Sequence, residues 1–541
     1  MSHRTLVLAG LIVLPALALS ANTLTVTSLA NSGPGSLRDQ VAASISGDTI
    51  QFATNGTIVL TAVIAINHTL WVQGPGASKL TVSGSSATRI FITSGNSVVL
   101  SGMTLRDGLF AAQPGVDGGL CSDGTPGGDA FGGAIFAGVN SSDTLILSNC
   151  WLTGNIARGG QGGRGGDGGT PVCVAGKGGA GGFAFGGALY ISAGYADAIN
   201  CTFSDNHAFG GRGGDGGNNL GQPTAAGAGG NGGSGAGGGA NVSNANGTPG
   251  FTNCTFSGNS AVGGDGGDGG TNIVAFPGGN GGNGGSGECG AITLQIKYSI
   301  ISCTIVSNSA VAGSGGAGGF GVPPGSSGAP GLGTAGGICG YAMLGCVGEM
   351  GNTILADNFA TTVQSNAYIN AVDLGFNYVG DNDYFNTCSP PQPNTRIGTV
   401  PAPLHPQLGP LAQNGGGLPT HAPLQGSPVI DWGNSLGTTT DERHAPRPVG
   451  FPLVSSGDGS DIGAFEFGST PLGMSIGGTN GTQVLITWPA YYGDFTLQSS
   501  SNLFAPDSWM SVTDMPAVVG DSFVVTNVPF GAVRFYRLVH P

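Results

Sequence analysis

The chain has 541 residues, enough for two or more domains, and a formal net charge of −14. Glycine contributes 108 residues, while charged residues make up only 8% of the chain, about a third of the share in ordinary soluble domains. A surplus of acidic side chains is repelled by nucleic-acid phosphates and by anionic lipids, so the composition argues against both as partners.

Residues 1–21 have the features of a secretory signal peptide. Arg4 supplies a positive charge, residues 6–19 are apolar, and small residues follow at the end of the segment. A membrane anchor is the alternative, but the apolar run is too short to cross a bilayer comfortably. No later stretch is apolar enough either. We therefore expect a secreted or surface-displayed protein with no transmembrane segment after cleavage.

The next segment, residues 23–108, is rich in short runs of β-branched and alternating apolar residues. Such runs, bounded by Gly, Asn or Ser, predict β-strands, here at 23–27, 49–52, 57–60, 69–72 and 97–100. The one helix candidate is 35–43, where Ser36 can serve as N-cap. No stretch shows sustained helical periodicity, so the sequence predicts an all-β fold.

A nine-residue phrase then recurs about every 50 residues. It reads NCWLTGNIA at 149–157, NCTFSDNHA at 200–208, NCTFSGNSA at 253–261, SCTIVSNSA at 302–310 and NTILADNFA at 352–360. The Cys positions are separated by 51, 53, 49 and 50 residues. A fixed period of this size predicts a solenoid, in which each unit buries its apolar face against its neighbours.

Three positions of the phrase are predicted to build the scaffold. In stacked parallel strands, equivalent residues lie about 4.8 Å apart, which favours a buried ladder of small residues over disulfides at Cys150, Cys201, Cys254 and Cys303. The apolar residue two places later is predicted to be core. Asn tolerates the left-handed conformation of a tight bend and can hydrogen-bond along the stack, which predicts an Asn ladder at Asn155, Asn206, Asn259, Asn308 and Asn358.

Glycine-rich insertions follow each phrase with a period of three, as in GGQGGRGGDGG at 159–169. Such sequence is usually a flexible linker. Period-three glycine also permits close packing of threefold extended helices of polyproline-II geometry, and the sequence leaves both alternatives open. Cys121 and Cys173 fall in neighbouring insertions and are the best disulfide candidates, and Cys289 and Cys339 also occupy similar repeat positions.

The insertions also carry candidate calcium ligands. GGRGGDGG and GGDGGDGG satisfy the first six places of the Gly-Gly-x-Gly-x-Asp repeat that binds Ca²⁺. At the eighth place, where that repeat has a large apolar residue, this chain has Gly. A single Asp per loop would also need ligands from other loops to bind the ion. A solvated Asp is therefore the preferred interpretation of Asp167, Asp215, Asp265 and Asp268, and we expect no cofactor.

The repeat stops before residue 405. Residues 405–467 hold the densest charged group of the chain, for which we predict a salt-bridged closure over the last solenoid turn rather than an active cleft: Asp431, Asp441, Arg443, Arg447, Asp461 and Glu466. A solenoid needs such a polar cap because its final rung would otherwise expose core. Alternating strands and turns at 472–541 predict a small β-sandwich.

Two groups of motifs resemble known families. NSGPGSLR at 31–38, followed by GDTIQF at 47–52, is similar to the N-terminal motif of bacterial surface proteins with right-handed parallel β-helices. Motifs at 408–411, 421–431, 441–443, 446–448 and 461–466 resemble, in order, the choice-of-anchor Q domain. The resemblance implies a pectin-lyase-like parallel β-helix at 22–404, and the last segment resembles fibronectin-III-like modules. It does not imply one reaction.

The sequence predicts no catalytic residue. Proteins that resemble this fold often cleave acidic polysaccharides, but the basic and acidic residues of the repeat region lie largely in Gly-rich loops, which hold catalytic geometry poorly. The favoured hypothesis is an exported structural or adhesion protein contacting polysaccharide, cells or matrix. The alternative is a polysaccharide lyase or glycoside hydrolase, which would be recognised by three or more carboxylates and a base converging on one outer face.

Overall fold

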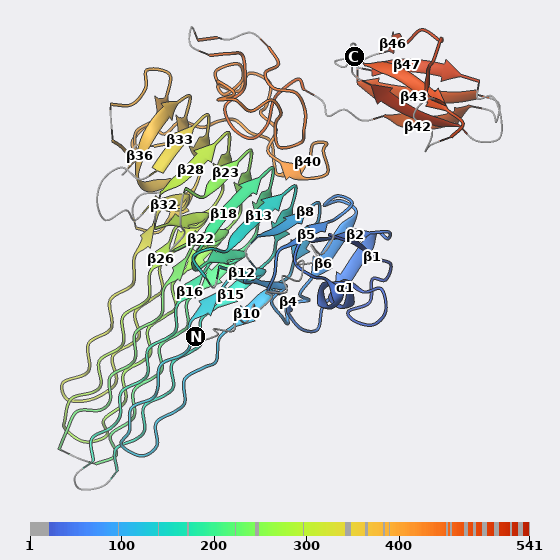
Figure 1. Ribbon diagram of the computed structural model, residues 1–541. Coiled ribbons are helices and arrows are strands. Elements are labelled where there is room, and N and C mark those ends of the chain that lie inside the picture. Colours follow the sequence, from blue (N-terminus) through green and yellow to red (C-terminus); the bar gives the residue numbers. More distant parts are fainter. Residues whose placement is uncertain are drawn as a thin grey trace, which may run out of the picture.

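Parallel strands stack along most of the chain into a β-helix (Figure 1). The computed structural model describes residues 21–469 apart from 96, 139, 170–172, 222, 244–247, 296, 341–347, 363–365, 382–384, 389, 451–452 and 455–456, and beyond them 474–479, 483–489, 495–502, 508–519, 522–528 and 534–539. Nearly all of the expected signal peptide lies outside the described residues.

The first wall of the solenoid is a 10-stranded parallel sheet. Each repeat contributes the strand that begins just after its Cys position. In order, the strands are β3 (Gly56–Val59), β6 (Leu80–Ser83), β9 (Thr104–Arg106), β14 (Trp151–Thr153), β19 (Thr202–Ser204), β24 (Thr255–Ser257), β29 (Thr304–Val306), β34 (Ile354–Ala356), β37 (Tyr378–Val379) and β39 (Arg396–Ile397).

The other two walls join into one 18-stranded sheet because β36 (Ala367–Gly375) pairs with strands of both. One wall contains β1 (Thr23–Val26), β2 (Asp48–Phe52), β5 (Leu70–Gln73), β8 (Val98–Ser101), β13 (Thr144–Ser148), β18 (Tyr195–Ile199), β23 (Gly250–Thr252), β28 (Tyr298–Ile301), β33 (Gly348–Gly351) and β38 (Phe385–Thr387). The other contains β4 (Ile64–Ile66), β7 (Phe91–Thr93), β12 (Ile135–Ala137), β17 (Leu189–Ile191), β22 (Ala240–Val242), β27 (Ile292–Leu294) and β32 (Ile338–Gly340).

Two short sheets flank each Gly-rich insertion. The strands that lead into the insertions, β10 (Leu109–Ala111), β15 (Ile156–Arg158), β20 (His207–Phe209), β25 (Ser260–Val262) and β30 (Ser309–Val311), form a 6-stranded sheet together with β35 (Phe359–Ala360) of the fifth phrase. The strands that receive the returning chain form a 5-stranded sheet of β11 (Ala130–Phe131), β16 (Ala184–Phe185), β21 (Gly235–Ala236), β26 (Gly287–Glu288) and β31 (Gly333–Thr334).

The core follows the register of the repeat. The apolar residues two places after the Cys position pair strand to strand and are fully buried: Leu152, Phe203, Phe256, Ile305 and Leu355. The rings of Phe203 and Phe256 stack with centroids 4.5 Å apart. The four ladder cysteines are also buried and remain free thiols. Stacking equal residues at equal height fills the interior, as the period requires.

The phrase Asn forms a buried ladder along the axis. Nδ2 of Asn155 donates to Oδ1 of Asn206 at 2.9 Å, and the same contact repeats from Asn206 to Asn259, Asn308 and Asn358. These residues do not adopt the left-handed conformation that the sequence suggested for them. That backbone falls on their predecessors, Gly154 and Asp205 for example, and on the Asn before Cys, such as Asn200 at φ 51°. The bend turns each ladder side chain inward.

The N-terminal end is covered by helix α1 (Leu37–Ala43). The side chain of Ser36 accepts a hydrogen bond from the Asp39 N–H at 3.2 Å and caps the helix, as predicted. Leu37 and Val41 are buried in the cluster that fills the solenoid. The helix therefore shields the first rung from water.

Residues 405–469, here called the strap, run along the outside of the 10-stranded sheet. The strap contains the hairpin of β40 (Ala412–Gln413) and β41 (Pro419–Thr420). His421 Nε2 lies 2.9 Å from Ser257 Oγ, the carbonyl of Thr440 accepts from Asn253 Nδ2, and the Gly463 N–H donates to Asn352 O. These contacts span several rungs, so the expectation of a closure over the last turn was wrong. The outward Thr and Asn of each repeat offer hydrogen bonds along the whole side.

The C-terminal segment forms two antiparallel sheets. One has the order β42 (Ser475–Thr479), β43 (Gln483–Pro489), β47 (Ser522–Asn527) and β46 (Ala517–Val519), and the other β45 (Met510–Ser511), β44 (Thr496–Ser500) and β48 (Phe535–Val539). Ile486, Trp488 and Val525 from the first sheet bury one apolar cluster with Leu497 from the second. The two sheets therefore pack face to face as a small β-sandwich.

Candidate functional site: the glycine-rich bundle

The insertions are ordered. Each leaves the solenoid as one extended segment and returns as another, and we call these segments legs. The legs lie side by side in one bundle (Figure 1). Successive N–H groups of a leg point in three directions. Gly266 donates to Ser314 O on the next leg, Gly267 donates to Gly230 O on a returning leg, and Asp268 donates to the carboxylate of Asp215. A repeat of three directions is the signature of threefold, polyproline-II-like backbone. The packed alternative therefore holds, and the flexible linker does not.

Glycine occupies two of every three positions because the neighbouring backbone leaves no room. A Cβ on Gly266 would lie 2.0 Å from Gly282 O, and one on Gly267 would lie 1.9 Å from Gly214 O. Both distances are far below van der Waals contact. The third position of each triplet faces out, so the bundle has two faces of side chains. We call them the outgoing face, on legs that leave the solenoid, and the returning face.

The four calcium candidates all lie on the outgoing face, where they serve the backbone. Each carboxylate accepts the outward N–H of a residue on the next leg: Asp167 from Asn218, Asp215 from Asp268, Asp265 from Ser314 and Asp268 from Ala317, at 2.8–2.9 Å. An outward N–H has no backbone partner, so a short acceptor here completes the bonding of the bundle. Among the described residues, no three His, Cys, Asp or Glu side chains are placed to hold a metal ion.

The outgoing face also carries ion pairs. Arg164 and Asp167 pair at 2.5 Å, and Arg212 contacts Asp215 at 2.7 Å and Asp268 at 3.5 Å. The hydrogen bond to Asp215 raises the pKa of Arg212, while bonds from Arg212 and from the Asp268 N–H lower the pKa of Asp215 against the opposing effect of burial. Both groups therefore stay charged at any physiological pH.

The returning face has a different chemistry. Its outward positions are mostly small and uncharged, such as Ala180, Ala228, Asn231, Asn283 and Ser326. Oδ1 of Asn231 accepts the Asn283 N–H at 2.9 Å, and Oδ1 of Asn283 accepts the Ala329 N–H at 2.9 Å. On these later legs, amides take the role that carboxylates take on the outgoing face, whereas on the first returning leg Asp123 and Asp129 accept the N–H groups of Lys177 and Phe183.

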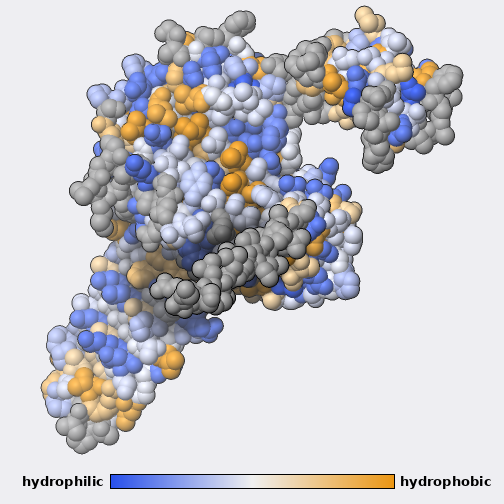
Figure 2. All heavy atoms as spheres, viewed as in Figure 1, coloured by the Kyte–Doolittle hydropathy of each residue, from blue (hydrophilic) through white to orange (hydrophobic). Residues whose placement is uncertain are grey.

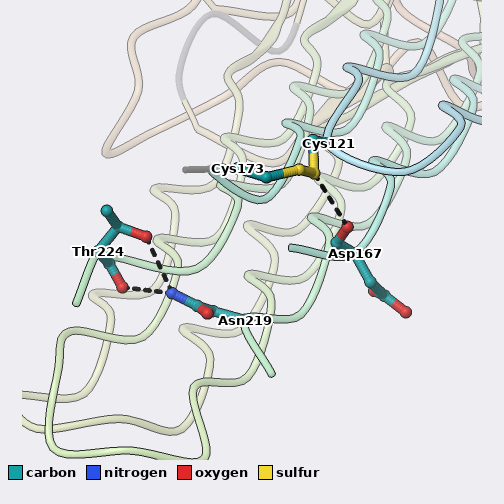
Figure 3. Close-up of a disulfide and its surroundings, with 5 residues drawn as sticks. All are labelled: Cys121, Asp167, Cys173, Asn219 and Thr224. Carbon is teal, nitrogen blue, oxygen red and sulfur yellow. Dashed lines mark hydrogen bonds between the residues drawn. A yellow bond between two sulfur atoms is a disulfide. The ribbon is translucent and has the colours of Figure 1, made fainter. Parts of the chain in front are cut away.

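The disulfide candidates meet at the far end of the bundle. Cys121 and Cys173 are joined by a disulfide between the first two insertions (Figure 3). The Cys121 N–H donates to the Asp167 carbonyl at 3.1 Å. A second disulfide joins Cys289 and Cys339, which are 50 positions apart, beside the bundle's base. Both connect consecutive units of the repeat.

A hollow of about 320 Å³ lies where the outgoing face meets the solenoid. We call it the root hollow. Its floor is glycine backbone, and its side chains are Arg158, Gln161, Phe209, Arg212 and Asp265. The guanidinium of Arg158 lies 5.4 Å from the ring centroid of Phe209, and the His207 ring stacks on Phe209 at 5.3 Å. Burial lowers the pKa of His207, which favours its neutral form.

The residues predicted as a cap form a buried network inside the strap. Arg443 pairs with Asp441 at 2.6 Å and Arg447 pairs with Glu466 at 3.0 Å. The carboxylate of Asp461 accepts the Asp431 N–H at 2.9 Å. Burial, followed by the nearby Glu466 charge, raises the pKa of Asp461 to about 8, and burial also raises the pKa of Glu466.

Sequence reasoning missed two groups. Glu442 of the strap is fully buried, and its two carboxyl oxygens accept hydrogen bonds from the hydroxyls of Thr202 and Thr255. The sequence signal that could have pointed to a buried partner was the Thr that directly follows Cys in both repeats, Thr202 and Thr255. Phe209 was also missed, because the position eight residues after each phrase Cys shows no fixed residue type: the equivalent residues are Arg158, Val262 and Val311.

No family model matches the chain, and no curated protein matches it. Among solved structures, the chain is similar to the springtail antifreeze protein from Granisotoma rainieri, described as a nine polyproline type II helical bundle. The two are 25% identical, and the match covers 39% of this chain and 94% of that one with a TM-score of 0.17. A TM-score this low supports no conclusion about this chain. In the part that the structure describes, no helix has the length and apolarity to cross a bilayer.

Proposed function

We propose that this protein is exported and has a structural or adhesive role, in which the bundle root contacts polysaccharide of a cell surface or matrix. The root hollow carries the proposal. It combines an aromatic ring, Phe209, with two guanidinium groups, an amide and a carboxylate around one concave surface. Sugars bind to such surfaces because their C–H faces pack on rings while their hydroxyls meet polar groups.

The rigidity of the surroundings supports the same role. The floor of the hollow is made of packed glycine legs in which Gly210 donates to Val262 O and Gly211 donates to Gly182 O, both at 2.8 Å. A floor fixed by backbone hydrogen bonds loses little conformational entropy when a ligand binds. The signal-like segment at 1–21 is the basis for export.

The test is a binding panel of soluble oligosaccharides and insoluble polysaccharides, read by calorimetry and by co-sedimentation of the full chain. We expect binding that Phe209→Ala weakens about tenfold or more, because stacking on one aromatic ring is worth roughly 0.5–1.5 kcal/mol beyond its buried area. The matched control is Phe359→Ala, an exposed Phe on β35 of the same sheet. Equal affinity of wild type and Phe209→Ala for every binder would contradict the proposal.

A polysaccharide-active enzyme is the second candidate, because the outgoing face collects Asp215, Asp265 and Asp268 around Arg212. The charges weigh against it. A lyase base must be able to lose its proton and a hydrolase acid must hold one, but the pKa of Arg212 is raised and that of Asp215 is lowered. Depolymerisation of any panel member that Asp265→Asn abolishes without loss of binding would favour the enzyme.

We further propose that residues 405–467 are a choice-of-anchor Q-like segment and that residues 472–541 are a fibronectin-III-like module. The ordered motifs of the strap support the first assignment, and the two antiparallel sheets support the second. A deletion that ends the chain at residue 469 tests the module's role. We expect it to leave binding at the root hollow unchanged, because that site is built from residues 158–265.

A further inference from the structure

The far end of the bundle exposes a cluster of large apolar side chains. Exposed fractions are 71% for Phe320, 66% for Ile273, 63% for Leu120 and 60% for Val322, and the cluster is completed by Val174, Leu220 and Phe276. All of these lie in or next to the turns that join outgoing to returning legs. Figure 2 shows apolar residues gathered near this end of the molecule. Large apolar side chains exposed together in one region mark an interaction site.

The turns lack charged residues. None occurs in 118–122, 168–175, 219–226, 271–278 or 320–325. The nearest charged residues are Asp117, Asp123 and Asp167, which directly border these ranges on the outgoing and returning legs. An apolar, uncharged end on an acidic chain has no attraction for an anionic surface, but it suits a neutral or zwitterionic one.

The backbone of the turns is closed by buried Asn side chains. Nδ2 of Asn219 donates to Thr224 O at 2.6 Å (Figure 3), and Nδ2 of Asn272 donates to Thr224 O at 2.8 Å and to Pro277 O at 3.2 Å. Both side chains are fully buried. Backbone that enters an apolar medium must have its polar groups satisfied within the protein, and these bonds satisfy the carbonyls of Thr224 and Pro277 in two of the turns.

The shape of the end favours a bilayer over a protein groove. The turns project at the end of rigid legs (Figure 1), and the Cys121–Cys173 disulfide holds the first two together. A projecting end with separate apolar side chains can sink into a lipid interface without a complementary partner surface. We propose that this end of the bundle inserts into the interface of zwitterionic lipid bilayers. This inference does not depend on the polysaccharide role.

The test is co-sedimentation of the full chain with phosphatidylcholine vesicles. We expect binding that Phe320→Ser with Ile273→Ser weakens by about tenfold or more, since burying one large apolar side chain changes partition by at least that factor. Val400→Ser, which replaces a side chain that is 60% exposed elsewhere, is the matched control and should bind as wild type does. The substituted side chains are exposed, so unchanged melting is expected for all three.

A second readout places the end in the lipid. Phe276→Trp should gain quenching by brominated phosphatidylcholine, whereas Phe359→Trp should not. No vesicle binding, equal binding of wild type and the double variant, or binding only to anionic vesicles would overturn the proposal. Self-association that the double variant abolishes, measured by sedimentation without lipid, would assign the surface to a second copy of the chain instead. Phe209→Ala should bind vesicles as wild type does, even where it has lost polysaccharide binding.

Discussion

The carboxyl of Glu442 accepts a hydrogen bond from the Thr202 hydroxyl at 2.7 Å, although 240 positions separate the two residues. This contact attaches the strap to the outward side of the 10-stranded sheet. Thr255, one repeat later, donates to the other carboxyl oxygen at 2.5 Å. No Lys, Arg or His is paired with Glu442 among the described residues, and burial raises its pKa well above 4.5.

Stability is therefore expected to depend on pH through Glu442. A raised pKa means that the folded state holds the proton more tightly, so the contribution of the group is complete below 4.5 and is lost as pH rises toward the folded pKa. Glu442→Gln is neutral at every pH and can bond to both hydroxyls. The unfolding free energy of this variant minus that of wild type should grow by up to about 1.4 kcal/mol per pH unit above 4.5.

The comparison is made at each pH by urea unfolding because other groups titrate too. Asp461, with its pKa raised to about 8, acts in the same direction, while burial lowers the pKa of His421 from 6.5 and opposes it below that pH. Both groups are present in wild type and variant, so they cancel in the difference. A difference that is constant from pH 4.5 to 8 would show that Glu442 titrates normally.

Arg443→Ala is expected to destabilise the strap strongly. It removes the partner of Asp441, whose side chain is fully buried, and it removes donors to the carbonyls of Glu466 and Ser469. Breaking a buried pair typically costs about 3–5 kcal/mol. Thermal unfolding measures the loss, and Arg537→Ala in the C-terminal sheets is the exposed control. Polysaccharide binding at the root hollow should not change; if it did, the strap would have a role in recognition.

Asn259→Ala is expected to open the Asn ladder at its centre. Its Nδ2 donates to Asn308 Oδ1 and Phe203 O, and its Oδ1 accepts from the Nδ2 and N–H of Asn206. Each buried group left without a partner costs about 1–3 kcal/mol. We expect a lower melting temperature, with little change for Asn55→Ala at an exposed position. If neither variant changed the melting temperature beyond experimental error, the ladder would not contribute to stability.

Gly267→Ala is expected to disrupt the bundle, because the new Cβ would lie 1.9 Å from Gly214 O. Hydrogen exchange should become faster across residues 263–286 and in the legs that bond to them. Ser314→Ala also introduces Ala into a leg, but at an outward position, and should leave exchange unchanged. Equal exchange in the two variants would mean that the legs are not packed as described.

The four ladder thiols should be unreactive in the native protein. Cys150, Cys201, Cys254 and Cys303 are buried, and burial raises the pKa of Cys254 well above 9. A thiol reagent should therefore label all four only after unfolding. Cys254→Ser should cost only about 1 kcal/mol, since the carbonyls of Ala198 and Thr252 lie 3.3 Å from the sulfur and can accept from a hydroxyl. Thr353 makes such a bond, to Gly351 O at 3.0 Å, in the fifth repeat.

The sequence alone determined the parts of this protein that repeat. The 50-residue period, the Cys position and the apolar residue two places on predicted stacked strands and their inward side chains, because a residue that recurs at equal spacing must meet its own copies. The same reasoning found the Asn ladder and the disulfide candidates. The same reasoning assigned the left-handed backbone to the ladder Asn, one residue too late. Residue type alone does not distinguish the Asn before Cys, which has a positive φ, from the ladder Asn after it, which does not.

Only the tertiary structure decided how the parts that do not repeat are used. Period-three glycine allowed a linker or a bundle, and the choice depends on legs from different repeats exchanging hydrogen bonds, such as Gly267 with Gly230. The strap was expected at the end of the solenoid and lies along its side, because Glu442 bonds to Thr residues of two earlier repeats. Contacts between distant segments depend on their placement in space, which the spacing of residues along a chain does not specify.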